Sequence, residues 1–128
     1  MANLRSLHAA ANSYVMDNKQ WPQIPYAKPG DPQYTKSWIE ALEPYGITHK
    51  NWICPTIQKL LKSPDYTKTP DLRIDYAATP FDEHYQTPYK WATQPWFVEK
   101  ADVHGNGNLM IYRDGTIEEL KNVRLMSN

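Results

Sequence analysis

Proline placement limits the folds open to this 128-residue chain more than any other feature of its sequence. The chain has eleven prolines against five glycines, and every proline lies between Pro22 and Pro95. Proline fixes its own φ angle, lacks a backbone N–H and biases the preceding residue away from the helical region. Only short elements therefore fit between these prolines, whereas longer ones are free to form on either side.

A helical pattern occupies the first 18 residues. Five apolar residues recur there at helical spacing and form one stripe: Leu4, Leu7, Ala11, Tyr14 and Val15. The pattern predicts an amphipathic helix that packs on the rest of the fold and ends near residues 17–19. No capping residue precedes it. We therefore expect residues 1–18 to be the C-terminal half of a helix that is longer in the natural protein.

The second half of the chain changes to a strand-like period. Alternating or β-prone segments predict four strands, at residues 72–76, 96–100, 108–112 and 116–120. Asp114-Gly115 between the last two predicts a tight hairpin with a primed turn, whose positive φ angles suit these two residues. Residues 37–42 and 56–62 are expected to form short helices, and residues 79–95 a long loop rich in Pro and Tyr.

These elements predict one α+β domain over residues 1–128. Residues 1–18 are its N-terminal amphipathic helix, residues 19–71 a loop region with short helices, and residues 72–128 a small antiparallel sheet. The expected arrangement is a helix laid against a meander, with long Pro- and aromatic-rich loops.

Composition narrows the classes of function. Fourteen basic residues balance fourteen acidic ones, so the chain lacks the charge typical of nucleic-acid binding. No run approaches the ~20 apolar residues of a membrane span. Cys54 is the single cysteine, which excludes an intrachain disulfide and favours a buried thiol. Five Trp and nine Tyr but two Phe favour half-buried positions that face water.

Two polar clusters have a chemical and a structural interpretation. Asp82, Glu83 and His84 suggest a catalytic or zinc site, but no second ligand cluster accompanies them, so a solvated loop is preferred. A second set suggests calcium binding, although it lacks the acidic density of a calcium loop, and a hydrogen-bonded loop is preferred there too. Its members are Asp102, His104, Asn106, Asn108 and Asp114. No nucleophile motif or phosphate-binding glycine loop is present, so the sequence predicts neither an enzyme nor a cofactor.

Four aromatic residues, Tyr85, Tyr89, Trp91 and Trp96, cross an otherwise polar segment. Exposed Trp and Tyr are favoured anchors for partners, so this segment is the candidate contact for a glycan or a protein. The alternative is that the long loop buries its own rings against the sheet, and this packing interpretation is preferred.

Four landmarks, in order along the chain, resemble those of prepilin-type proteins of the H-X9-DG family. His104 is followed after nine residues by Asp114-Gly115, which matches the motif that names the family. The other three are similar to an exposed pilin-type helix, its Asp-Asn-x-x-aromatic-Pro exit and a short Cys-Pro segment. They are residues 3–14, residues 17–22 (Asp-Asn-Lys-Gln-Trp-Pro) and residues 52–55 (Trp-Ile-Cys-Pro).

This resemblance implies a pilin-like fold and a role in assembly. The chain would be a structural subunit of a type II secretion pseudopilus or a type IV pilus-like filament, with His104, Asp114 and Gly115 maintaining the fold. Upstream, it implies a short basic leader, a prepilin peptidase site whose product is N-methylated, and an apolar half-helix that anchors the subunit in the inner membrane. The globular domain would then lie in the periplasm or outside the cell. Its partners would be other pilin-like subunits and the secretion machinery.

Overall fold

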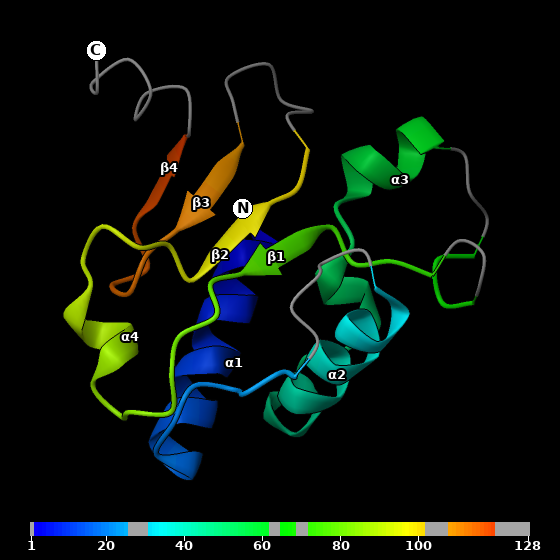
Figure 1. Cartoon of the computed structure of the whole chain (residues 1–128). Helices are drawn as coiled ribbons and strands as arrows, with labels where there is room; N and C mark the ends of the chain where they lie inside the picture. Colours follow the sequence, from blue (N-terminus) through cyan, green and yellow to red (C-terminus); the bar gives the residue numbers. More distant parts are fainter. Residues whose placement is uncertain (1, 26–30, 62–64, 69–71, 102–107, 120–128) are drawn as a thin grey trace.

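A 17-residue helix, α1 (Ala2–Asn18), lies against a four-stranded antiparallel sheet with the order β1-β2-β3-β4 (Figure 1). The computed structural model describes the chain except residues 1, 26–30, 62–64, 69–71, 102–107 and 120–128. The other helices are α2 (Pro32–Leu42), α3 (Pro55–Leu61) and α4 (Thr87–Lys90), with 3-10 turns η1 (Glu43–Tyr45) and η2 (His49–Trp52). The strands are β1 (Tyr76–Ala78), β2 (Phe97–Glu99), β3 (Leu109–Ile111) and β4 (Ile117–Glu119). The predicted α+β class is confirmed.

Helix α1 buries the face that its apolar spacing predicts. Its buried residues are Leu4, Leu7, Ala10, Ala11 and Val15, and they pack toward β2, β3 and α2. The helix ends where Lys19 takes a left-handed conformation with a φ of 60°, and the Lys19 amide donates to the Val15 carbonyl at 2.8 Å. This left-handed residue closes the last turn and redirects the chain toward Trp21-Pro22.

Helix α2 begins five residues earlier than predicted. The Asp31 side chain accepts a hydrogen bond from the Gln33 amide at 2.8 Å, and Pro32 occupies the first helical turn. A proline is well tolerated there, because its missing N–H would have no partner inside the helix. The sequence predicts a loop at Pro32. Because Asp31 caps the helix just before it, Pro32 instead begins α2.

In the middle of the chain, the strand predicted at residues 72–76 is wrong in its position, and the loop predicted at residues 79–95 contains a short helix. Strand pairing begins at Tyr76 and runs to Ala78, not over residues 72–76. The Arg73 amide donates to Tyr66 and the Asp75 amide to Trp52, so these residues pair with loop segments instead. Within the expected loop, the short helix α4 forms around Pro88.

The hairpin between β3 and β4 forms where Asp114-Gly115 predicts it. Ile111 pairs with Ile117 and Leu109 with Glu119. Gly115 has a φ of 85°, but Lys19 alone among the described non-glycine residues has a positive φ. Asp114 therefore does not adopt the positive φ of the expected primed turn. The Gly115 amide donates to the Tyr112 carbonyl at 2.9 Å, which describes a type I-like turn followed by a left-handed glycine.

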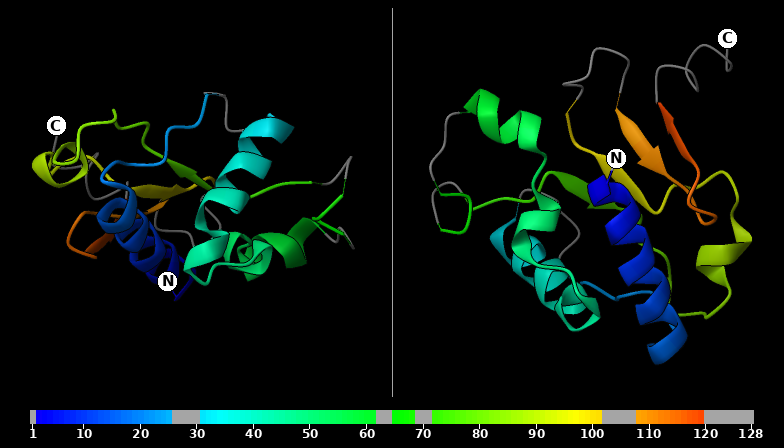
Figure 2. Two further views of the ribbon diagram at one scale, coloured as in Figure 1. Left: turned by 90° about the horizontal axis from the view of Figure 1, so that it is seen from below. Right: turned by 180° about the vertical axis from the view of Figure 1, so that it is seen from behind.

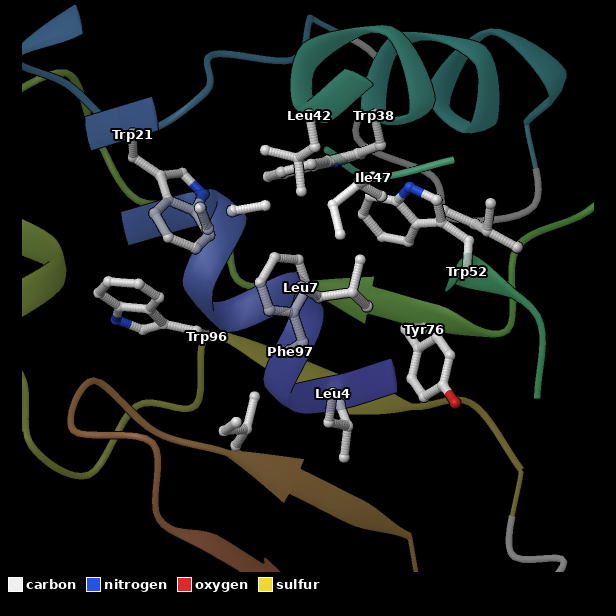
Figure 3. Close-up of a cluster of buried hydrophobic side chains, with 14 of the residues drawn as sticks. Leu4, Leu7, Trp21, Trp38, Leu42, Ile47, Trp52, Tyr76, Trp96 and Phe97 are labelled. Carbon is white, nitrogen blue, oxygen red and sulfur yellow. The ribbon is translucent and has the colours of Figure 1, made fainter. Parts of the chain in front are cut away.

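The core is a cluster of tryptophans around Phe97 (Figure 3). The Phe97 ring lies 5.8 Å from each of the rings of Trp21, Trp38 and Trp52, and the Trp21 ring lies 5.0 Å from that of Trp96. All four tryptophans are buried. The expectation that the Trp residues face water is therefore wrong for four of five, because large rings fill the space between short elements.

We predict that Phe97→Ala lowers the free energy of unfolding by about 3 to 5 kcal/mol, the usual cost of deleting a buried ring. The reason is that Phe97 is fully buried and no small side chain can restore its contacts with three indoles. Trp91→Ala is the matched control, since Trp91 is 51% exposed and its loss should change stability by less than about 0.5 kcal/mol. Urea unfolding followed by far-UV circular dichroism measures both. Equal effects of the two variants would contradict this description of the core.

Candidate functional site

The turn that follows β3 is attached to α1 through His8. The His8 Nε2 lies 2.8 Å from the Arg113 carbonyl oxygen, and the imidazole ring lies 4.8 Å from the Trp96 ring. A Cβ added at Gly115 would lie 3.8 Å from the His8 ring, so the turn passes directly over this histidine. His8 is not among the candidate residues of the sequence analysis. No local signal pairs residues that are 105 positions apart.

The structure describes only some of the residues of the H-X9-DG motif and of the candidate calcium site. His104 lies outside the described residues, as do Asp102 and Asn106. The Asp114 carboxylate accepts a hydrogen bond from the Thr116 amide at 3.0 Å, and hydrogen bonds from the Thr116 side chain and then its amide lower the pKa of Asp114. The Asn108 amide group donates to the Glu99 carbonyl at 2.9 Å. Asp114 and Asn108 thus both hold the sheet and its turn together.

Asp82, Glu83 and His84 form an exposed turn. The Asp82 carboxylate accepts from the Thr87 hydroxyl at 2.7 Å and from the His84 amide at 3.0 Å. These hydrogen bonds, that of Thr87 first, lower the pKa of Asp82. The His84 imidazole lies 3.2 Å from the same carboxylate, with its side chain 76% exposed. This geometry fastens the segment that leads into α4, as the solvated-loop interpretation expects.

The four aromatic residues divide into packed and exposed members. Trp96 is fully buried and its indole donates to the Pro88 carbonyl at 2.9 Å, so this residue offers no surface to a partner. The Tyr89 hydroxyl donates to Asn12 of α1 at 2.7 Å. Tyr85 is half-buried, with the Lys19 ammonium 5.3 Å from its ring centre. Trp91 is exposed and has the Lys90 ammonium 5.7 Å from its ring.

Cys54 is buried beside the Arg73–Asp75 salt bridge. The Asp75 carboxylate accepts from the Cys54 amide at 2.7 Å and pairs with Arg73 at 2.9 Å, while Arg73 also donates to Gln58 at 2.7 Å. Burial raises the pKa of the Cys54 thiol, which disfavours the reactive thiolate. Cys54 therefore helps to fix the segment that enters α3.

Two hollows lie near opposite ends of α1. The first, about 220 Å³, follows the end of α1 and is lined by Pro22, Gln23, Ile24, Tyr34, Trp38, Ala78, Pro80, Phe81, Asp82 and Glu83. The second, about 580 Å³, lies beside Asn3 and α3 and is lined by Asn3, Lys50, Asn51, Ile53, Pro55, Gln58, Lys59 and Tyr66. The lining of the first includes two carboxylates, and that of the second two lysines. The two hollows are thus of opposite charge.

Within the described ranges, His, Cys, Asp and Glu side chains form no group of three or more that is placed to hold a metal ion. The helices described here are too short or too polar to span a bilayer. Comparison of the chain with protein-family profiles, curated proteins and solved structures finds no match.

We predict that His8→Ala loosens the hairpin turn. The change removes the ring contact with Trp96 and the hydrogen bond to Arg113, and we expect a loss of about 1 to 2 kcal/mol in unfolding free energy. Hydrogen exchange of the Gly115 and Thr116 amides should accelerate relative to amides of β1.

His8→Phe is the matched variant, because it keeps a ring beside Trp96 but cannot bond to Arg113. Its effect on exchange should fall between those of the native chain and His8→Ala. If His8→Ala leaves the exchange of the turn unchanged, the turn does not depend on this contact.

Proposed function

We propose that this chain is the globular part of a pilin-like structural subunit. It would form a type II secretion pseudopilus or a type IV pilus-like filament in the cell envelope, and it would act by assembly and not by catalysis. One observation carries the proposal: three of the landmark segments lie at the exit of α1, near its start and against His8 in its middle. Trp21 is buried at the exit of α1, and Gly115 lies against His8. Cys54 is buried and follows Ile53, whose carbonyl accepts a hydrogen bond from Asn3 at the start of α1.

The position of α1 supports the proposal further. Its outer face is open to solvent and lies on the outside of the fold (Figure 2). The exposed residues of this face include Ala2, Arg5, Ala9, Ser13 and Met16. Three of them, Ala2, Ala9 and Ser13, are small and let a neighbouring backbone approach closely, so this part of the face suits contact with helices of other copies. In this proposal the apolar segment that anchors the subunit precedes α1, and the globular domain faces the periplasm or the exterior.

The test is the mature N-terminus of the native protein. We expect mass spectrometry of the protein from the membrane fraction of its native cells to find an N-methylated residue. About 20 apolar residues, the length of a membrane span, should then precede the sequence Asn3-Leu4-Arg5. Sheared extracellular or periplasmic filaments should contain the same chain. A mature protein that begins at Met1 and is absent from every filament fraction would contradict the proposal.

A binding module is the second candidate, and the exposure of Trp91 favours it. Trp91 is 51% exposed, with the Lys90 ammonium 5.7 Å from its ring. Sugar rings and protein partners both use exposed indoles as anchors. The module would recognise a glycan or a protein outside the cell.

Trp91→Ala distinguishes this role from packing. We expect it to reduce binding to an immobilised glycan array by roughly tenfold or more, the loss of a central aromatic contact, with unfolding unchanged. Met16→Ala, at a residue that is 56% exposed on α1, is the control. Absence of array binding by the native chain, or equal binding by both variants, would leave Trp91 without this role.

A further inference from the structure

Helix α3 presents two leucines to solvent. Leu60 is 65% exposed and Leu61 is 56% exposed, whereas Ile57 on the other side of the helix is buried. Lys59 is exposed next to them. The protruding feature is therefore a pair of aliphatic side chains with a positive charge beside it, on a helix at the edge of the molecule (Figure 1).

The hollow after α1 is complementary to this helix in polarity and in charge. Its apolar lining includes Trp38, Phe81 and Ile24, and Asp82 and Glu83 are its acidic members. Its volume of about 220 Å³ is many times the ~10–15 Å³ that admits one water, which is enough for branched aliphatic side chains.

The hollow is fixed in place by hydrogen bonds. The Gln23 side chain donates to the carbonyls of both Trp21 and Phe81 at 2.9 Å. The Tyr34 hydroxyl accepts from the Ala78 amide at 3.2 Å. These contacts join the segment after α1, helix α2 and the segment after β1. A partner would thus meet a preformed surface and would pay little ordering cost.

The two features cannot meet within one copy. Asn3, at the start of α1, donates to the Ile53 carbonyl at 2.8 Å, which places the approach to α3 at that end of the helix. Pro22 and Ile24 line the hollow just after the other end. With 17 residues, α1 is about 25 Å long at 1.5 Å per residue.

We infer that copies of this chain associate head to tail, with Leu60 and Leu61 of α3 inserted in the hollow after α1 of the next copy. In this contact Asp82 and Glu83 of one copy face Lys59 and Lys50 of the other. The interface uses different patches on each side, so it is heterologous and propagates along a strand of copies. The inference rests on the proposed filament function, and it names the surface through which neighbouring globular domains bind.

The test is self-association of this 128-residue chain in solution. We expect the amide resonances of α3 and of residues 78–83 to shift with concentration up to about 1 mM, the range of a weak single contact. Leu60→Ser with Leu61→Ser should weaken the association by roughly tenfold or more. Because both leucines are exposed, the thermal unfolding midpoint should stay the same.

Charge reversal makes the test specific. Lys59→Glu and Glu83→Lys should each weaken association about two- to fivefold, as expected for an exposed ion pair, and the double variant should restore it. Trp91→Ser and Lys90→Glu near α4 are the apolar and charge controls, and they should leave the association unchanged.

Two outcomes would overturn the inference: no concentration dependence in the native chain, or shifts that map away from α3 and the hollow. The proposed function is judged separately, by the mature N-terminus and the filament fractions. If filaments contain the chain but the shifts are absent, the proposed function is supported and this contact is contradicted. If the shifts are observed but no filament contains the chain, the contact is supported and the proposed function is contradicted.

Discussion

The contact of Phe97 with three indoles is the interaction on which the rest of the fold depends. Trp21 follows α1, Trp38 lies in α2 and Trp52 ends η2, so one ring of β2 joins three segments to the sheet. Strands of three residues supply little stability through their own pairing, and such a sheet needs a packed face. Two of these indoles, in Trp21 and Trp52, have buried N–H groups that find no hydrogen-bond partner among the described residues. Each costs about 1 to 3 kcal/mol, which the burial of the rings offsets.

The sequence predicted the elements whose signals are local. The bounds of α1 follow from its apolar spacing, and the β3–β4 hairpin follows from Asp114-Gly115. The prediction was less accurate where one residue type occurs in two kinds of structure. Proline is common in loops and at helix starts, and Pro32, predicted to lie in a loop, begins a helix. Likewise, the alternating pattern of residues 72–76 arises from an irregular segment in which Ile74 and Asp75 are both buried. Alternation therefore did not mark a strand there.

The candidate site was less predictable because its contacts are distant in sequence. The motif located the turn at Asp114-Gly115, but the partner of that turn is His8 on α1, and the sequence ascribed no role to it. Trp96 illustrates the same limit, since its identity suits either a partner or the core. Its position one residue before β2 fixes the ring against Trp21 and His8. The fold topology, and not the local sequence pattern, determines which of these aromatic side chains are exposed.

The exposure of Leu60 and Leu61 is unusual when the residue types of the core and of the surface are compared. Leucine is buried more often than tryptophan in most domains, yet here four tryptophans fill the core while Leu60 and Leu61 stay outside. The cause is geometric: α3 has seven residues, and Ile57 and the preceding Cys54 already occupy its buried side. The prolines that keep the elements short thus have two effects. They require large rings in the core, and they leave small helices whose outer faces are free to contact another molecule.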